Sequence, residues 1–170
     1  MLSCRNVIAF AIAASCTAVP FAATAELVYV TQWGSDGNGL TQFHYPTGMA
    51  IGPSGDVFVT DGGNHRVCRY TPDGQIVMTF GGLGNGPGKL NTPDFLAFSP
   101  TNGDLYIADK LNHRIQRFTE AGAFVQAWGS LGPGPGQFNA PWGVHVDADG
   151  YVFVTSLNQD RVQKFTEDAT

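Results

Sequence analysis

The chain has 170 residues, of which only 14% are charged, while 22 are glycine and 10 are proline. This length is enough for one domain with a hydrophobic core, and the many turn-forming residues are typical of short strands joined by tight turns. The net charge of −5 argues against nucleic acid or an anionic membrane surface as a partner, because both require a basic face.

The first 25 residues differ in composition from the rest of the chain. Arg5 is their only charged residue, an apolar run extends from Val7 to Val19, and Ala23-Thr24-Ala25 follows. A basic start, a short apolar stretch and an A-x-A sequence predict a secretory signal peptide over residues 1–25, cleaved before Glu26. The apolar run is too short to span a bilayer. We therefore expect a secreted or periplasmic protein with no membrane span after cleavage.

Two other interpretations of this leader remain open. It could be an uncleaved membrane anchor, or a lipoprotein signal that uses Cys16, although Ala13-Ala14-Ser15 lacks the usual large aliphatic residue. Cleavage would remove Cys4 and Cys16 and leave Cys68 with no partner for an internal disulfide. Because Cys68 lies in an apolar strand pattern, we expect a buried and unreactive thiol there.

The sequence repeats itself with a period near 47 residues. Four markers keep one register, namely an aromatic–glycine pair, a proline, a turn glycine and an arginine, and the spacings are 47 or 48 residues. They are Trp33-Gly34, Phe80-Gly81 and Trp128-Gly129; Pro46, Pro93 and Pro141; Gly55, Gly103 and Gly150; and Arg66, Arg114 and Arg161. Four independent markers in one register identify an internal repeat.

Each repeat shows the pattern of short strands that follow a glycine-rich connection ending at the proline. The predicted strands are Gly48–Gly52 and Gly143–Asp147; Val57–Val59, Leu105–Ile107 and Val152–Val154; Arg66–Thr71, Arg114–Thr119 and Arg161–Thr166; and Gln75–Phe80 and Ala123–Trp128. Glycine is expected at the turns between them because tight hairpins need positive φ. Four short antiparallel strands at this period predict the blades of a β-propeller, and their alternation excludes helical repeats.

Two kinds of motif carry a family resemblance. The segments Phe80-Gly-Gly-Leu-Gly-Asn-Gly-Pro-Gly-Lys-Leu-Asn-Thr-Pro and Trp128-Gly-Ser-Leu-Gly-Pro-Gly-Pro-Gly-Gln-Phe-Asn-Ala-Pro resemble the opening of an NHL repeat, and Asp61-Gly-Gly-Asn64-His65-Arg66-Val67 and Asp109-Lys-Leu-Asn112-His113-Arg114-Ile115 resemble its signature. The resemblance implies an all-β fold, with three NHL-type repeats as half of a six-bladed propeller. It implies little about function, because one fold hosts many activities.

The resemblance also suggests how the chain is divided. We expect a signal peptide at 1–25 and a propeller domain at 26–170, with a donated strand at 26–33 and blades at 34–80, 81–128 and 129–170. Residues 28–33 align with the fourth strand of a blade, and the last blade lacks its own fourth strand. Three blades cannot close a ring. The chain is therefore interpreted either as a fragment of a longer propeller or as half of a head-to-tail homodimer that exchanges this strand.

The polar residues of the signature are expected to hold the blades together. They are Asp61, Asn64, His65 and Arg66; Asp109, Asn112, His113 and Arg114; and Arg161. Each aspartate is expected to pair with the arginine five residues later and to brace the loop, and each histidine is expected to be a hydrogen-bonding group of the loops. The third repeat has Ser156, Gln159 and Asp160 in place of the aspartate, asparagine and histidine, so Asp160 is expected to replace the missing partner of Arg161.

The residues that follow the blade-opening prolines are the candidate ligand-binding residues. Thr47, Asp94 and Trp142 would start the innermost strands and surround the mouth of the central channel. A carboxylate and an indole there could bind a cationic or sugar-like group. The alternative is a water-filled channel with incidental residues.

The same positions bear on catalysis. NHL-like peptide-amidating lyases carry zinc-binding histidines after the corresponding prolines, which this chain lacks, and the acidic ligands of lactonase-type propellers are matched only by Asp94. We therefore expect a non-catalytic scaffold, without metal or cofactor, for a protein, small-molecule or glycan partner. The alternative is a fragment or protomer of a secreted lyase or lactonase-like enzyme whose site is completed by missing blades or a second copy.

Overall fold

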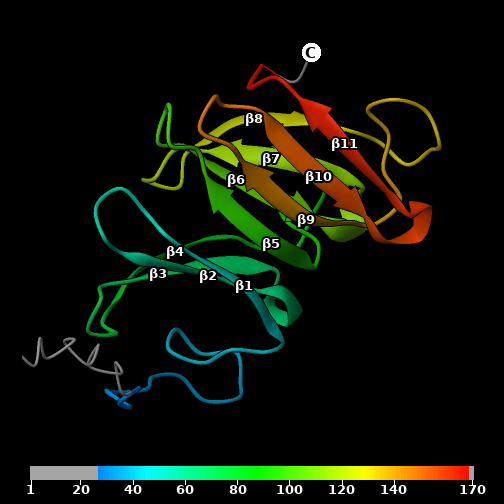
Figure 1. The fold of residues 1–170 in the computed structure, drawn as a ribbon. Coiled ribbons are helices and arrows are strands. Elements are labelled where there is room, and N and C mark those ends of the chain that lie inside the picture. The colour runs from blue at the N-terminus through cyan, green and yellow to red at the C-terminus, as the bar shows by residue number, and fades with distance from the viewer. Residues whose placement is uncertain (1–26, 169–170) are drawn as a thin grey trace, which may run out of the picture. The chain divides into compact units, whose positions relative to one another are not determined.

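The computed structural model describes residues 27–168, and residues 32–170 form one compact unit. In the described part, three antiparallel sheets contain all the strands (Figure 1). The strands are β1 (Pro46–Ile51), β2 (Val57–Asp61), β3 (Arg66–Tyr70), β4 (Ile76–Gly81), β5 (Pro93–Phe98), β6 (Leu105–Asp109), β7 (Arg114–Phe118), β8 (Phe124–Trp128), β9 (Pro141–Val146), β10 (Val152–Ser156) and β11 (Arg161–Phe165). The predicted all-β fold of three propeller-type repeats is confirmed.

Each sheet is one blade in which the strand order follows the chain. Blade one has the order β1-β2-β3-β4, blade two has β5-β6-β7-β8, and blade three has β9, β10 and β11. The first hairpin of each blade turns at Gly55, Gly103 or Gly150, whose φ angles are 89°, 75° and 87°. Only glycine adopts such angles without a steric penalty, which explains why these three positions repeat.

A short 3-10 helix connects the second and third strands of each blade. These helices are η1 (Gly62–Asn64), η2 (Lys110–Asn112) and η3 (Leu157–Gln159). The residue after each helix is left-handed: φ is 57° at His65, 54° at His113 and 48° at Asp160. The signature loop is therefore one conformation used three times, even where its residues differ.

The innermost strands begin earlier than the apolar pattern predicts. β1 begins at Pro46 rather than Gly48, and β9 begins at Pro141 rather than Gly143. Pro46 lies opposite Asp61, and the register then shifts before Met49. This irregularity is a bulge, where proline is tolerated within a strand, so the pattern of side chains alone did not reveal the additional residues.

The hydrophobic core lies between neighbouring blades. Phe58 and Val67 of blade one pack with Leu96, Leu105, Ile107 and Phe118 of blade two and with Leu90 of the connection. Tyr106, Ala108 and Ile115 of blade two pack in the same way with Val144, Val146, Val152, Val154 and Phe165 of blade three and with Phe138. Strand β5 lies between β1 and β9, so the three innermost strands are neighbours (Figure 1). Each blade is thus held by the face of the next one.

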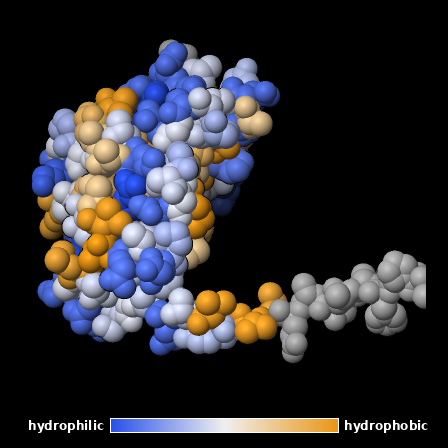
Figure 2. Space-filling model, turned by 90° about the vertical axis from the view of Figure 1, so that its left-hand side faces the viewer, coloured by the Kyte–Doolittle hydropathy of each residue, from blue (hydrophilic) through white to orange (hydrophobic). Residues whose placement is uncertain are grey.

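Blade three has three strands, and β11 is at its edge. The strand predicted over residues 28–33 is not present: no strand is assigned from residue 27 to Tyr45, since a strand forms only against a neighbouring edge. The predicted signal peptide lies outside the described residues. Among the residues described, no helix has the length and apolar character needed to cross a membrane. Figure 2 shows separate hydrophobic patches on a surface that is otherwise largely hydrophilic.

Candidate functional site

The signature aspartate of blade one joins the 3-10 turn to the connection before it. Asp61 Oδ2 accepts hydrogen bonds from Asn64 Nδ2 and Arg66 Nε, each at 2.8 Å, while Oδ1 accepts one from the His44 N–H at 2.7 Å. The Asp61 side chain is buried. Arg66 also donates through Nη2 to the carbonyls of Gly39 and Gln42. The predicted Asp61–Arg66 pair is present and braces a loop.

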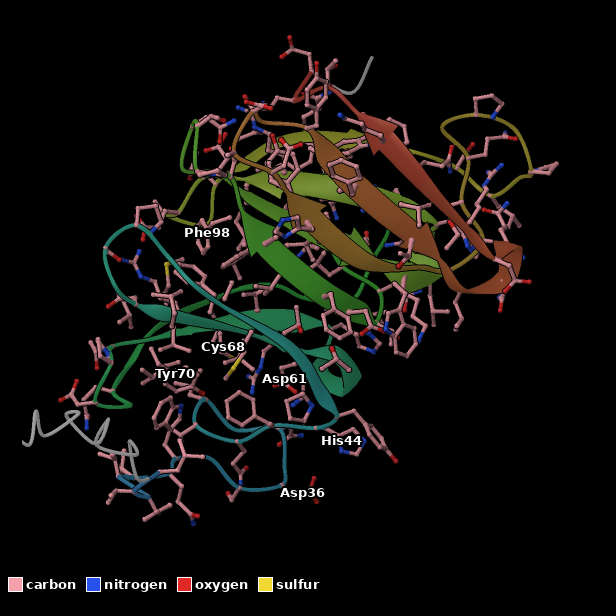
Figure 3. All side chains as sticks on the ribbon, in the orientation of Figure 1. Asp36, His44, Asp61, Cys68, Tyr70 and Phe98 are labelled. Carbon is pink, nitrogen blue, oxygen red and sulfur yellow. The ribbon has the colours of Figure 1, made fainter. Side chains whose placement is uncertain are left out.

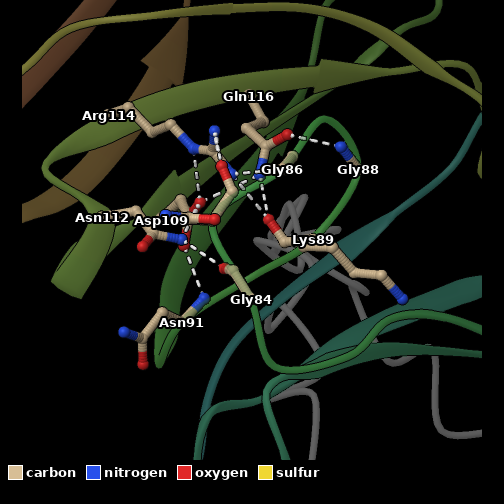
Figure 4. Close-up of polar contacts among 10 residues, drawn as sticks. Gly84, Gly86, Gly88, Lys89, Asn91, Asp109, Asn112, Arg114 and Gln116 are labelled. Atoms are coloured by element: carbon tan, nitrogen blue, oxygen red, sulfur yellow. Dashed lines mark hydrogen bonds and ion pairs between the residues drawn. The ribbon is translucent and has the colours of Figure 1, made fainter.

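The same network recurs in blade two (Figure 4). Asp109 Oδ2 accepts hydrogen bonds from Asn112 Nδ2 at 2.9 Å, Arg114 Nε at 2.7 Å and Gln116 Nε2 at 2.9 Å, and Oδ1 accepts from the Asn91 N–H at 2.7 Å. Both oxygens of this buried carboxylate are thus hydrogen-bonded within the chain. These aspartates and arginines are therefore structural groups.

The signature histidines, predicted as hydrogen-bonding groups of the loops, connect neighbouring blades. His65 Nδ1 accepts from the Thr92 N–H at 2.9 Å, and His113 Nδ1 accepts from the Ala140 N–H at 3.1 Å. Thr92 and Ala140 directly precede the blade-opening prolines. Each histidine thus fixes the first residue of the following blade, and its acceptor nitrogen carries no proton.

Blade three corrects the prediction for Asp160. No ion pair joins Asp160 to Arg161 in the described residues, and the buried Nε of Arg161 and Oγ of Ser156 have no hydrogen-bond partner there. Gln159 performs part of the missing role instead. Its Oε1 accepts from the Asn139 N–H at 3.1 Å, and its Nε2 donates to the Gly132 carbonyl at 2.6 Å. The side chain of glutamine, one methylene longer than asparagine, explains how it reaches both groups.

The three candidate ligand-binding residues begin β1, β5 and β9, as expected, but their environments differ. Thr47 is exposed, and its Oγ1 lies 3.1 Å from Thr60 Oγ1. Asp94 is buried, with 2% of its side chain exposed, so its carboxylate does not face the solvent. Trp142 is half-buried. The structure brings Asp94 and Trp142 together through a residue that the sequence did not single out.

That residue is Lys110, which bridges blades two and three. Its Nζ lies 3.2 Å from Asp94 Oδ2 and 4.0 Å from the centre of the Trp142 ring. Phe95, which is 40% exposed, has its ring centre 6.3 Å from that of Trp142. We call Asp94, Phe95, Lys110 and Trp142 the inner-end cluster. Its Asp94 Oδ1 is buried without a partner in the described residues. Lys110 was missed because Gly62 and Leu157 take its place in the other repeats.

Other titratable side chains lie on blade one (Figure 3). Cys68 and Tyr70 are neighbours on β3, while Asp61 ends β2, and His44 Nδ1 lies 3.4 Å from Asp36 Oδ1. Burial raises the pKa of the Cys68 thiol to about 11 and that of Tyr70 to about 12. The thiol is therefore protonated at neutral pH. Among the described residues, no three His, Cys, Asp or Glu side chains are grouped closely enough to hold a metal ion.

Comparison with known proteins finds NHL repeats at two positions in the chain. The model of the NHL repeat matches residues 43–70 and 90–118. RING finger protein nhl-1 of Caenorhabditis elegans is 40% identical over 58 residues, which are 34% of this chain and 6% of that protein. Protein brain tumor of Drosophila melanogaster is 29% identical over 72 residues, which are 42% of this chain and 7% of that protein. The chain therefore matches only a small part of each curated relative.

Solved structures of propeller proteins match a larger part of the chain. A catalytically inactive virginiamycin B lyase from Staphylococcus aureus, solved with quinupristin, is 25% identical, with a TM-score of 0.60. The match covers 74% of this chain and 39% of the lyase. The structure in the nidogen/laminin complex matches with a TM-score of 0.58 at 19% identity and shows likeness of fold alone. The blades described above are thus of the β-propeller type.

Proposed function

We propose that this NHL-repeat protein, whose blades are those of a β-propeller, is an exported binding scaffold without catalytic activity. The observation that carries the proposal is the inner-end cluster. Phe95 and Trp142 present partly exposed rings near the starts of adjacent innermost strands, and the Lys110 ammonium contacts both the Trp142 ring and Asp94. Aromatic surface beside a hydrogen-bond donor is the usual composition of a ligand-binding site.

The chemistry of the cluster favours a carbohydrate over a cation. The face of Trp142 already contacts the Lys110 ammonium, so a cationic ligand would have to displace a like charge. A sugar ring could pack on Phe95 and accept hydrogen bonds from Lys110. The signature aspartates, asparagines and arginines are unavailable to a ligand, because their bonding capacity is used within the blades. We therefore propose a glycan or a glycosylated partner as the ligand class.

A carbohydrate panel tests this proposal. The purified chain is screened against an array of neutral and acidic oligosaccharides, and hits are measured by isothermal titration calorimetry. Phe95→Ala and Trp142→Ala are each expected to weaken binding roughly tenfold or more, because each removes one stacking surface. Phe124→Ala is the matched control, since Phe124 is 38% exposed and lies on the outer strand β8. Equal affinity of all three variants for a hit would place its site elsewhere.

The alternative is that the chain contributes blades to a propeller enzyme. It is supported by the likeness to virginiamycin B lyase, of which the chain covers 39%. Incubating the chain with quinupristin and following the compound by mass spectrometry distinguishes the two. Conversion by the purified chain would favour the enzyme, whereas unchanged compound combined with saturable glycan binding would favour the scaffold.

Export is part of the proposal and rests on the composition of residues 1–25. The chain is expressed with its own leader in a bacterial host, and cell fractions are analysed by intact mass. A mature mass that begins at Glu26 in the periplasm or medium is expected. A full-length chain in the cytoplasm would contradict it.

A further inference from the structure

The two end blades each leave open a face that is buried in every other blade. Met49, Leu96 and Val144 occupy the same position on the innermost strands, yet Met49 is 70% exposed, whereas the other two are buried. Val67, Ile115 and Val162 likewise share a position on the third strands. Val162 is 63% exposed, while its two equivalents have no exposed surface. Among the described residues, no blade therefore packs on Met49 before blade one or on Val162 after blade three.

These open faces are the two halves of one kind of contact. In the blade-one to blade-two contact, Val67 belongs to one side and Leu96 to the other, and both lie in the same cluster. In the next contact, Ile115 and Val144 have the same relationship. The open side of blade three, with Val162, thus corresponds to the side that Val67 and Ile115 form. The open side of blade one, with Met49, corresponds to the side that Leu96 and Val144 form.

Each open face also carries an apolar hollow. That of blade three has a volume of about 360 Å³ and is lined by Thr155, Leu157 and Val162, among others, and by Trp142, which it shares with the inner-end cluster. That of blade one has about 330 Å³ and is lined by Trp33, Phe43, Met49 and Val59, among others. Exposed apolar side chains gathered in this way are typical of a protein–protein contact.

Trp33 indicates what lies before blade one. Phe80 lies near the end of the fourth strand of blade one, and its ring centre is 5.1 Å from that of Phe118 on the third strand of blade two. Trp128 ends the fourth strand of blade two and is 6.0 Å from Phe165 of blade three. Trp33 is 6.2 Å from Tyr70 of blade one. Trp33 therefore occupies the position of the last residue in the fourth strand of a preceding blade.

The open faces also carry an acceptor and a donor in the positions of the hydrogen bond that joins neighbouring blades. His65 and His113 accept a hydrogen bond from the first residue of the next blade. Asp160 has the place and left-handed conformation of these histidines, with φ of 48°. Tyr45 has the place of Thr92 and Ala140, with φ of 51° against their 51° and 56°. A carboxylate is a good acceptor for the Tyr45 N–H, so the bond can form between Asp160 and Tyr45.

We propose that a second copy of this chain covers both faces, with blade three of each copy packed head to tail on blade one of the other. The partner's residues 28–33 then add the missing fourth strand beside β11. Two such contacts close a ring of six blades, within the range of four to eight that propellers adopt. The occupant is a second copy because the required surface, with its tryptophan and backbone donor, exists on the chain itself.

Association and its polarity are tested on the purified full chain by sedimentation velocity over a range of concentrations. The wild type is expected to have the mass of two chains rather than of one. Val162→Lys and Met49→Lys each put a charge into both contacts and are expected to raise the dissociation constant roughly a hundredfold. Val125→Lys is the control, because Val125 is exposed on β8 of the middle blade.

Mixing distinguishes a head-to-tail contact from a symmetric one. Val162→Lys chains mixed with Met49→Lys chains form one intact contact, so they are expected to associate more tightly than either variant alone. Circular dichroism of each variant shows whether it is folded, and hydrogen exchange of the β11 amides in the wild type gives a readout without mutation. A monomeric wild type, an open series of larger assemblies, unprotected β11 amides, or mixed variants that do not associate would each overturn the proposal.

Discussion

His65 Nδ1 accepts a hydrogen bond from the Thr92 N–H at 2.9 Å and thereby joins blade one to the first residue of blade two. The bond requires both the imidazole and the left-handed backbone at His65, where φ is 57°. An Asp, Asn or His is tolerated in this region better than most residues. The contact therefore explains why a histidine ends the signature loop in blades one and two.

Removing this histidine is expected to destabilise the protein. His65→Ala deletes the acceptor of a part-buried N–H and places alanine at positive φ, which together should lower the free energy of unfolding by about 1–3 kcal/mol. Urea denaturation measures the change. His145→Ala is the control, since His145 is exposed on β9. Equal stability of the two variants would show that the His65 bond contributes nothing.

A second prediction concerns the unpaired arginine nitrogen in blade three. Ser156→Asp places a carboxylate where Asp61 and Asp109 lie in the other blades, next to Arg161 Nε. A charge-assisted bond of this kind should stabilise the fold by about 1–3 kcal/mol. The double variant Ser156→Asp/Gln159→Asn restores the aspartate and the asparagine of the first two repeats and should be at least as stable as Ser156→Asp alone.

The reverse change in blade two serves as the matched comparison. Asp109→Ser removes the acceptor of four hydrogen bonds and is expected to cost about 3–5 kcal/mol, because it takes away the charge partner of Arg114 and the acceptor of its Nε. Thermal and urea denaturation of both variants test this. A Ser156→Asp chain less stable than the wild type would mean that Gln159 already fills the space.

A third prediction follows from the buried thiol. Burial raises the pKa of Cys68 to about 11 from an ordinary value of 9.0. Below pH 9 the thiol is protonated in both the folded and unfolded states. Above pH 9 the thiol ionises in the unfolded chain, which lowers the free energy of the unfolded state relative to the folded state. The stability contributed by the protonated thiol is therefore lost as the pH rises from 9 towards 11. Urea denaturation across this range should show the decline, and Cys68→Ala should show a smaller one.

Reactivity provides a separate measurement of the same thiol. A disulfide reagent at pH 8 is expected to modify Cys68 slowly in the native protein and quickly in urea, since the thiolate is the nucleophile and the side chain is buried. Rapid modification under native conditions would contradict the burial of this residue.

A fourth prediction concerns Glu167, which connects blade three to blade two. Burial opposes ionisation, but hydrogen bonds from the Ser99 and Thr101 hydroxyls outweigh it and hold the pKa of the Glu167 carboxyl below its ordinary 4.5. A depressed pKa contributes stability above the unfolded value, which is lost as the pH falls below 4.5. Glu167→Gln should therefore flatten the decline of stability between pH 5 and 3. An unchanged acid profile would argue against this connection.

The repeat was sufficient to predict the blades. Markers such as Trp33, Pro46 and Gly55 recur at fixed spacing because each performs one geometric role, and the strand pattern between them is regular. The Asp61–Arg66 pair was predictable for the same reason. The strand at residues 28–33 was not found, because a strand depends on an edge that lies elsewhere in space.

The inner-end cluster could be predicted only in part. The position of Asp94 at the start of an innermost strand followed from the proline before it, whereas its burial depends on Lys110, from a later turn of the same blade. Similarly, the role of Gln159 depends on the reach of its side chain, and nothing in its spacing distinguishes it from Asp160. The local sequence was thus sufficient to predict the positions of these residues in the strands and loops, whereas their roles depend on contacts between loops.

The packing of Trp33 against Tyr70 has a consequence for how such a protein can lengthen. One 47-residue period of sequence runs from the last strand of one blade through three strands of the next, so covalent units and spatial units are out of phase. Duplicating any such period inserts the end of one blade together with the beginning of another. A duplicated period therefore already contains the strand that completes the blade before it. The array can gain a blade in this way without a separate linker.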